Sequence, residues 1–328
     1  GATWSVQSQE TNTAPPTERE QWCAILISGE RRRLMYRDAN LAAYAKLPCK
    51  LERTDIYIVL QVLDDAAAAQ DNSPHRSGVR PYDASRESVV AFFESKGFGG
   101  VHYEIAPHVD YSTKPGGSAD PGGPHFVTPG RWSANVNMLR SRFAVVERAT
   151  QAPLVAGRTY SFFLMMRDDN TFWEETRFEA SDALVFDCGS DFFGVDDKIM
   201  FGSAAEFTAF WGLGFDAAME LFREWRYATT EQLYVLMLAK AAVVSASKVG
   251  RFAMCRSDEA YADYGDRGVL RGRGYDKKVE CAWKTGVCGH ECPKALAALR
   301  SKLRVLREGW ASGTPRSDIA HQYDAFVL

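Results

Sequence analysis

A run of apolar residues that ends in charged residues constrains the fold of this chain most. Residues 160–166 read Tyr-Ser-Phe-Phe-Leu-Met-Met, with six apolar or aromatic residues in seven. This composition predicts a strand that is buried on both faces, as in a parallel sheet covered by helices. The run is followed at once by Arg167, Asp168, Asp169 and Asn170. Because ligands of open α/β sheets bind beyond the carboxyl ends of strands, this point predicts a binding site.

The carboxylates of Asp168 and Asp169 indicate what this site binds. Two acidic side chains at a buried strand end are costly unless a cation or hydrogen-bond donors compensate them. Hard oxygen ligands suit magnesium or manganese, and such ions are commonly shared with substrate phosphates. We therefore predict a divalent Mn or Mg cation at Asp169 and Asp168, beside a phosphorylated donor. If the pair serves only this purpose, replacing either residue with alanine should leave the melting temperature nearly unchanged. A strand-end turn with a helix N-cap remains the alternative interpretation.

Strands and helices alternate along the chain. Apolar runs predict strands at residues 22–28, 55–63, 101–107 and 182–187, and helical patterns predict helices at 34–47, 85–96, 132–150, 204–224 and 230–247. This alternation is typical of a single α/β domain with a mainly parallel central sheet flanked by helices. We predict a flexible stem at 1–20, a catalytic domain at 21–247, and an irregular Cys-rich C-terminal extension at 248–328 packed on it. The extension contains one clear helix, around 294–308, and residues 111–131 form a long loop.

Composition excludes some classes of partner. The net charge is −3, so no basic surface indicates nucleic acid. No run of about 18 apolar residues exists, so we expect no membrane span within this sequence. The chain begins with Gly1 and Ala2 rather than methionine, and we expect that a leader or the anchor of a type II membrane protein has been removed.

The chain contains seven cysteines, whose state indicates the cellular compartment in which the protein works. Cys281, Cys288 and Cys292, together with His290, could hold zinc. Their spacing lacks the paired C-x-x-C of common zinc modules, which favours disulfides in the 281–292 cluster, although zinc stays open. Disulfides indicate the lumen of the secretory pathway, in the Golgi or ER, with the cytoplasm as the alternative. In this interpretation Cys23 is a buried cysteine left without a partner.

The end of the first predicted strand offers a second set of polar groups. It opens into Ser28, Gly29, Glu30 and Arg31. A turn of small residues lets backbone amides approach a phosphate or a base, and arginine can pair with a diphosphate. A tight turn followed by a solvated basic helix start is the alternative interpretation.

Four short motifs then carry a resemblance. They are Cys-Ala-Ile-Leu-Ile-Ser-Gly-Glu-Arg-Arg at 23–32, Thr-Asp-Ile-Tyr-Ile-Val at 54–59, Met-Met-Arg-Asp-Asp-Asn at 165–170, and Phe-Gly-Val-Asp-Asp-Lys-Ile-Met-Phe-Gly-Ser at 193–203. Their order over residues 22–245 resembles a group of nucleotide-sugar glycosyltransferases with the GT-A fold, found in bacteria, algae and large viruses. That group has an Arg-x-Asp-type strand end and a Gly-Gly-(Val/Ile)-Asn-Asp-(Arg/Lys) loop. This chain departs from it with Arg-Asp-Asp in place of Arg-Pro-Asp, and with Phe193 in place of glycine.

The resemblance implies metal-dependent transfer of a sugar from a nucleotide-sugar donor to a glycan or glycoprotein acceptor. The implied donor-binding residues are Ser28, Gly29, Glu30, Arg31, Arg140, Arg167 and Asp168, and the implied catalytic residues are Asp197, Asp196 and Glu231. In an inverting reaction one of these three carboxylates deprotonates the acceptor hydroxyl. Glu231 follows two threonines and equally suits helix capping, and Arg140 equally suits a helix surface. A carbohydrate- or nucleotide-binding domain without turnover is the alternative function.

Overall fold

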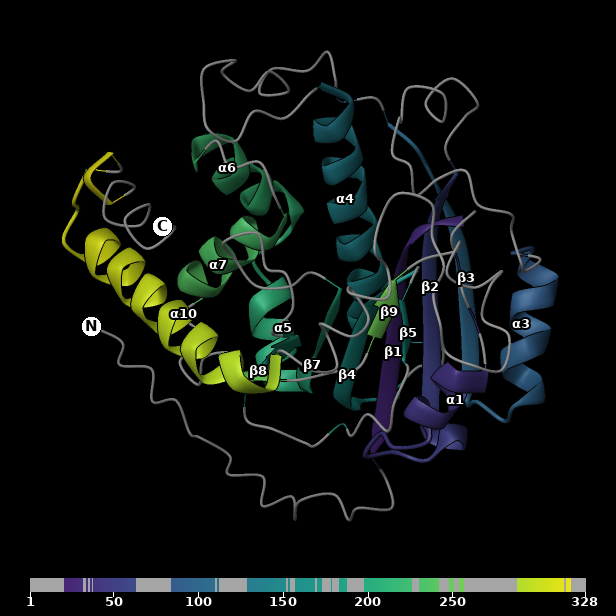
Figure 1. Cartoon of the computed structure of the whole chain (residues 1–328). Coiled ribbons are helices and arrows are strands. Elements are labelled where there is room, and N and C mark those ends of the chain that lie inside the picture. The colour runs from purple at the N-terminus through teal and green to yellow at the C-terminus, as the bar shows by residue number, and fades with distance from the viewer. Residues whose placement is uncertain are drawn as a thin grey trace, which may run out of the picture.

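A seven-stranded sheet forms the centre of the described part of the protein, with strand order β3-β2-β1-β4-β7-β6-β8. The computed structural model describes residues 21–31, 34, 36, 38–62, 84–109, 111, 129–151, 153, 157–168, 170–172, 178, 183–187, 198–225, 230–241, 248–250, 254–256, 288–315 and 317–319. The strands of this sheet are β1 (Trp22–Glu30), β2 (Thr54–Val62), β3 (Gly100–Pro107), β4 (Tyr160–Arg167), β6 (Val185–Asp187), β7 (Ile199–Ser203) and β8 (Lys248–Gly250). Figure 1 shows the sheet between helices.

Parallel pairing dominates the sheet. β3, β2, β1 and β4 run parallel to one another, and β6 runs parallel to β8. β7 lies antiparallel to both β4 and β6. β1 and β2 are buried along almost their whole length, as expected for strands covered on both faces. The predicted α/β class with a mainly parallel sheet is confirmed, and it is consistent with the GT-A-like fold that the resemblance implies.

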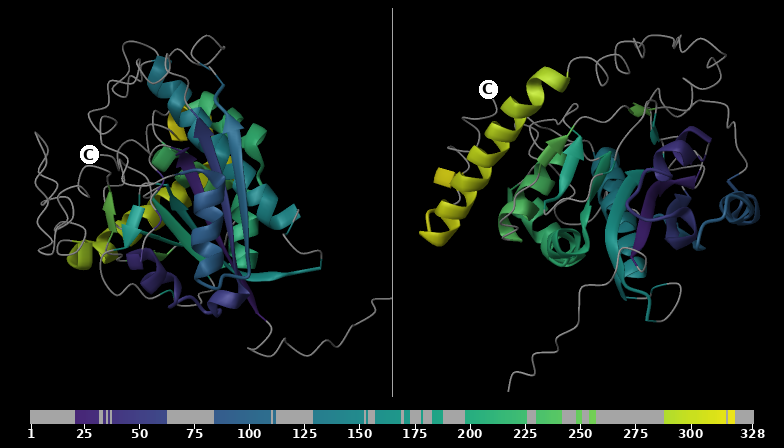
Figure 2. Two further views of the ribbon diagram at one scale, coloured as in Figure 1. Left: turned by 90° about the vertical axis from the view of Figure 1, so that its right-hand side faces the viewer. Right: turned by 90° about the horizontal axis from the view of Figure 1, so that it is seen from below.

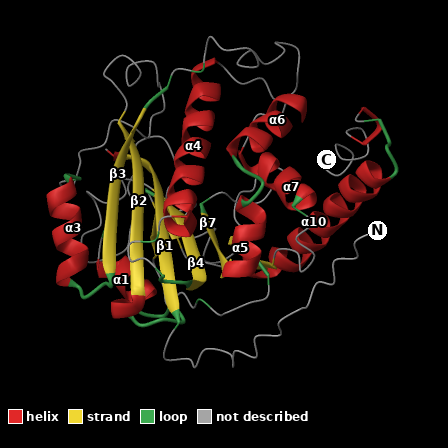
Figure 3. Ribbon diagram, turned by 180° about the vertical axis from the view of Figure 1, so that it is seen from behind, coloured by secondary structure: helices red, strands yellow, loops and turns green. Residues whose placement is uncertain are grey.

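Helices pack on both faces of the sheet and on one another. They are α1 (Asp38–Tyr44), α3 (Arg86–Ser95), α4 (Pro129–Gln151), α5 (Ala204–Trp211), α6 (Phe215–Trp225), α7 (Thr230–Lys240) and α10 (Cys288–Ala311), with a 3-10 turn η3 (Leu51–Arg53). α4 and α5 pack on one face, where Leu139, Phe143 and Val146 of α4 lie in the core. Figure 3 shows α4 in front of the sheet from this side. α1 and α3 contribute to the core on the opposite face.

Two predicted elements differ from the structure. The helix expected at 204–224 is broken into α5 and α6, because Gly214 adopts a φ of 82° that suits glycine and interrupts the helical path. Residues 199–203, for which the sequence predicted no strand, form β7. This strand is only five residues long and contains Gly202, so it lacks the length and alternation that identify strands in a sequence.

The described parts of residues 248–328 are joined to the rest of the protein. β8 pairs with β6, and β9 (Met254–Arg256) pairs with β5 (Asn170–Phe172) in a second, two-stranded sheet. α10 packs on α7 and β8, at the end of the molecule away from α3 (Figure 2). The predicted stem at 1–20 and most of the predicted 111–131 loop lie outside the described residues. Among the described helices, none is long and apolar enough to cross a bilayer.

A disulfide joins Cys23 of β1 to Cys49, with 5.8 Å between the Cα atoms. The expectation that Cys23 lacks a partner is therefore wrong. The sequence separation of 26 residues hides this pairing, because no local pattern connects the two cysteines. The side chains of the 281–292 cluster lie outside the described residues, so the choice between disulfides and zinc there stays a prediction.

Replacing Cys49 with serine should lower the free energy of unfolding by about 3 kcal/mol, because the cross-link restricts the unfolded chain. Urea denaturation of the variant and of the wild type measures this difference. Mass spectrometry of denatured, alkylated wild type should show Cys23 labelled only after reduction. Labelling of Cys23 without reductant would contradict the pairing.

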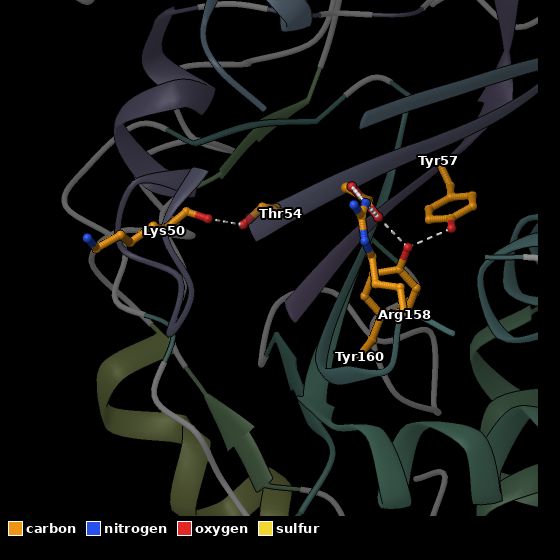
Figure 4. Close-up of polar contacts among 6 residues, drawn as sticks. Lys50, Thr54, Tyr57, Arg158 and Tyr160 are labelled. Carbon is orange, nitrogen blue, oxygen red and sulfur yellow. Dashed lines mark hydrogen bonds and ion pairs between the residues drawn. The ribbon is translucent and has the colours of Figure 1, made fainter. Parts of the chain in front are cut away.

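A buried network of polar groups ties β1, β2 and β4 together at their amino ends (Figure 4). Arg158 donates to both carboxylate oxygens of Asp55, at 2.8 and 2.7 Å, and Tyr160 donates to Asp55 Oδ2 at 2.5 Å. The hydroxyls of Tyr57 and Tyr160 lie 2.7 Å apart, and the Arg158 guanidinium stacks 3.5 Å from the centre of the Trp22 ring. Burial, followed by the hydrogen bonds to Asp55 and Tyr57, raises the pKa of Tyr160 far above its usual range.

Replacing Arg158 with alanine should cost about 3–5 kcal/mol of stability, because it leaves the fully buried Asp55 carboxylate without its cation. The matched control is Arg148→Ala. Arg148 bonds Glu104 at 2.8 Å but is half exposed, so its loss should cost less than about 1 kcal/mol. Urea unfolding curves of both variants measure the contrast. Equal losses would show that burial does not set the strength of the Asp55 pair.

Candidate functional site

The polar residues predicted at two separate strand ends lie together at one edge of the sheet. β1 and β4 are parallel neighbours, and their register places Ser28 beside Arg167. Gly29 and Glu30 therefore adjoin Asp168, which directly follows β4. The carboxyl ends of two central parallel strands are where open α/β sheets bind ligands. The structure thus brings together five of the predicted donor-binding residues.

Asp168 fastens the end of β4 to the end of β1. Its backbone N–H donates to the carbonyl of Ser28 at 3.0 Å, and its Oδ2 accepts a hydrogen bond from the Glu30 N–H at 2.7 Å. The carboxylate lies directly over Gly29, where a Cβ atom would come within 2.0 Å of Asp168 Oδ1. Gly29 also has a φ of 152°, which L side chains rarely adopt. Position 29 therefore requires glycine.

This geometry bears on the predicted metal site. Asp168 is only 1% exposed, and one of its oxygens already accepts from the β1 backbone. This hydrogen bond holds the two strand ends together, and the role of Asp168 as a metal ligand stays a prediction. The contact with Glu30 changes the expectation for the Asp168→Ala variant: its melting temperature should fall, because the buried Glu30 N–H would lose its acceptor. Asp169 lies outside the described residues, so its metal-binding role stays a prediction.

Arg31, Arg140 and Glu231, which were also predicted as site residues, lie on other parts of the structure. Arg31 Nε donates to the carbonyl of Ala84 at 3.1 Å, just beyond β1. Arg140 of α4 donates to the carbonyl of Pro107 at 3.3 Å, so it lies at the end of β3, two strands away from β1. Glu231 lies in the first turn of α7, which packs chiefly against α6 and α10.

Asp196 and Asp197 lie outside the described residues, so their catalytic role stays a prediction. The chain is described again from Lys198, whose carbonyl accepts the Arg167 N–H at 3.1 Å. The structure thus places Lys198, in the middle of the 193–203 motif, against the strand end that carries Asp168. The sequence alone did not show this proximity.

Sequence reasoning did not assign a role to a second group of polar residues at this edge. Asn137 of α4 is fully buried and uses its side-chain amide to bind Val109 in both directions, at 3.0 and 2.6 Å. Ser133, one turn earlier, accepts from the N–H of Tyr111 at 3.1 Å. Gln61 at the end of β2 donates to the carbonyl of Asn137. These contacts hold the segment after β3 against α4. The sequence carried no clear signal for them, because α4 is rich in polar residues and the spacing of Ser133 and Asn137 does not show that both are buried.

Comparison with known proteins adds little. No protein-family model matches the chain, and no curated protein matches it. Among solved structures, the apo form of mouse xyloside xylosyltransferase 1 is similar with a TM-score of 0.31 and 9% sequence identity. The match covers 70% of this chain and 85% of that one. Similarity at this level is too low to assign a reaction.

Gly29→Ala should destabilise the protein, because the new Cβ atom would clash with the Asp168 carboxylate. Asp168→Ala should lower the free energy of unfolding by about 1–3 kcal/mol, because it leaves the buried Glu30 N–H without an acceptor. In the double variant the clash disappears, so the combined loss should be smaller than the sum of the single losses by at least about 0.5 kcal/mol. Urea denaturation of the three variants measures this coupling. Asp168→Asn, which keeps an acceptor oxygen, is the matched control and should lose less than Asp168→Ala. Strictly additive losses would contradict the contact.

Proposed function

We propose that this protein is a glycosyltransferase that moves a sugar from a nucleotide-sugar donor to a glycan or glycoprotein acceptor. The observation that carries the proposal is the convergence of Ser28, Gly29 and Glu30 with Arg167 and Asp168 at the carboxyl ends of β1 and β4. These residues belong to two of the motifs that resemble GT-A glycosyltransferases. Their meeting at the ligand-binding edge of an α/β sheet supports a shared role for the motifs.

Each residue at this edge has a role in the proposed reaction. The β1 segment from Ser28 to Arg31 holds the nucleotide, with Asp168 fixing the shape of that segment through the Glu30 N–H. Arg167 offsets the negative charge that grows on the diphosphate as its bond to the sugar breaks. The acceptor oxygen bonds to the sugar carbon, and in an inverting reaction Asp196 or Asp197 takes its proton.

A divalent cation, Mn or Mg, is part of the proposal. The burial of Asp168 leaves Asp169 as the first candidate to bind it. When bound, such an ion would neutralise charge on the diphosphate.

The disulfide of Cys23 with Cys49 supports a compartment for this activity. Disulfides form and persist mainly in oxidising environments, such as the lumen of the secretory pathway. We therefore propose the ER or Golgi lumen as the location, where glycan and glycoprotein acceptors are also found.

The test is release of nucleoside diphosphate from a panel of sugar nucleotides in the presence of manganese. The wild type should release it slowly to water and faster when an acceptor is present. Asp169→Asn should lower turnover at least about 100-fold without changing the melting temperature, because it removes charge stabilisation of the leaving group. Asp216→Asn, an exposed aspartate on α6, is the control and should retain full turnover.

Two outcomes would contradict the proposal. A thermal shift with a sugar nucleotide but no release of diphosphate under any condition would indicate a binding domain without turnover. Full turnover of Asp169→Asn in chelator-washed protein would reject its role as metal ligand.

A further inference from the structure

Three polar side chains form a row across the ends of three neighbouring strands. The register of β1 and β4 pairs Ser28 with Arg167, and the Arg167 N–H bonds the Lys198 carbonyl beside β7. Since cross-strand neighbours point to the same face, all three side chains face the layer of α4 and α5. The residues two positions earlier along β1 and β4, Leu26 and Met165, are in the core on that face.

The row is buried and rich in positive charge. Lys198 is 2% exposed, Arg167 7% and Ser28 1%. Burial strengthens the interaction of each cation with any charge beside it. The buried carboxylates of Glu30 and Asp168 lie at the same strand ends, and a ligand with several anionic oxygens can accept further hydrogen bonds from both cations. Both cations make other contacts within the protein, so an anionic ligand would add to a network that already holds them in place.

Ser28 supplies the independent observation that points to a ligand. Its hydroxyl is buried and has no hydrogen-bond partner in the part of the chain that the structure describes. A buried hydroxyl without a partner costs free energy, and a ligand oxygen at this position would remove that cost. The hydroxyl stands beside Arg167 in the row, so the same oxygen-rich group can reach both.

We propose that Lys198 and Arg167, together with the Ser28 hydroxyl, bind the diphosphate of the donor. This inference rests on the proposed function for the identity of the ligand, and it adds Lys198 as a binding residue on the β7 side of the site. Arg167 is the last residue of β4 and Lys198 directly precedes β7, so both stand at the edge where the strands end. Two charged donors from different strands fix the position of the leaving group as well as its charge.

The experiment is isothermal titration of UDP, GDP, ADP and inorganic pyrophosphate in manganese buffer. The wild type should bind at least one of these probes. Lys198→Met should weaken the tightest of them about tenfold or more, the loss expected for a charge-assisted hydrogen bond. Lys198→Arg should stay within about threefold of the wild type. Lys50→Met, whose side chain is 80% exposed at the amino edge, is the control and should bind like the wild type.

Ser28→Ala is a second test variant that should fold normally, because it removes only a hydroxyl without a hydrogen-bond partner among the described residues. It should keep or raise the melting temperature and weaken the same probe about threefold or more. Wild-type affinity in a folded Lys198→Met variant overturns the inference, as does the lack of binding of any probe to the wild type. Diphosphate binding through Lys198 without any sugar release would sustain this inference and reject the proposed function. Sugar release with an unchanged affinity in Lys198→Met would do the reverse.

Discussion

The contact of the Asp168 carboxylate with the end of β1 is the interaction on which the candidate site depends. The carboxylate accepts a hydrogen bond from the Glu30 N–H, and the backbone N–H of Asp168 donates to the Ser28 carbonyl, so that Asp168 joins two central strands at their carboxyl ends. This contact is possible only because Gly29 has no side chain. The position of β4 relative to β1 in turn sets where Arg167 lies. The geometry of the site is therefore built into the packing of the sheet.

The two edges of the sheet use their polar groups differently. At the amino edge, the buried Asp55 carboxylate receives hydrogen bonds from Arg158 and Tyr160, both from the chain at the start of β4. At the carboxyl edge, the buried Ser28 hydroxyl has no partner among the described residues. A satisfied buried network stabilises and orders a fold, whereas an unsatisfied group costs stability. This contrast is consistent with a structural role for the amino edge and supports the proposed binding role of the carboxyl edge.

Much of the fold could be predicted from the sequence because the central strands are long and strongly apolar. β1, β2 and β4 were identified in this way, and the helical pattern at 132–150 identified α4. β7 was missed because five residues with an internal glycine carry no clear period. The partner of Cys23 was missed because a disulfide depends on distance in space, which the chain order does not reveal.

The sequence by itself determined the α/β class and the presence of polar residues at two strand ends, because local composition and periodicity decide which segments become buried strands. Only the tertiary structure decided that those two ends adjoin, since strand order in a sheet is set by long-range packing. It also placed the Asp168 carboxylate against the backbone of β1. In the sequence, a carboxylate that follows a strand predicts a ligand-binding side chain. In the structure, the Asp168 carboxylate is buried and one of its oxygens accepts a hydrogen bond from the backbone of β1.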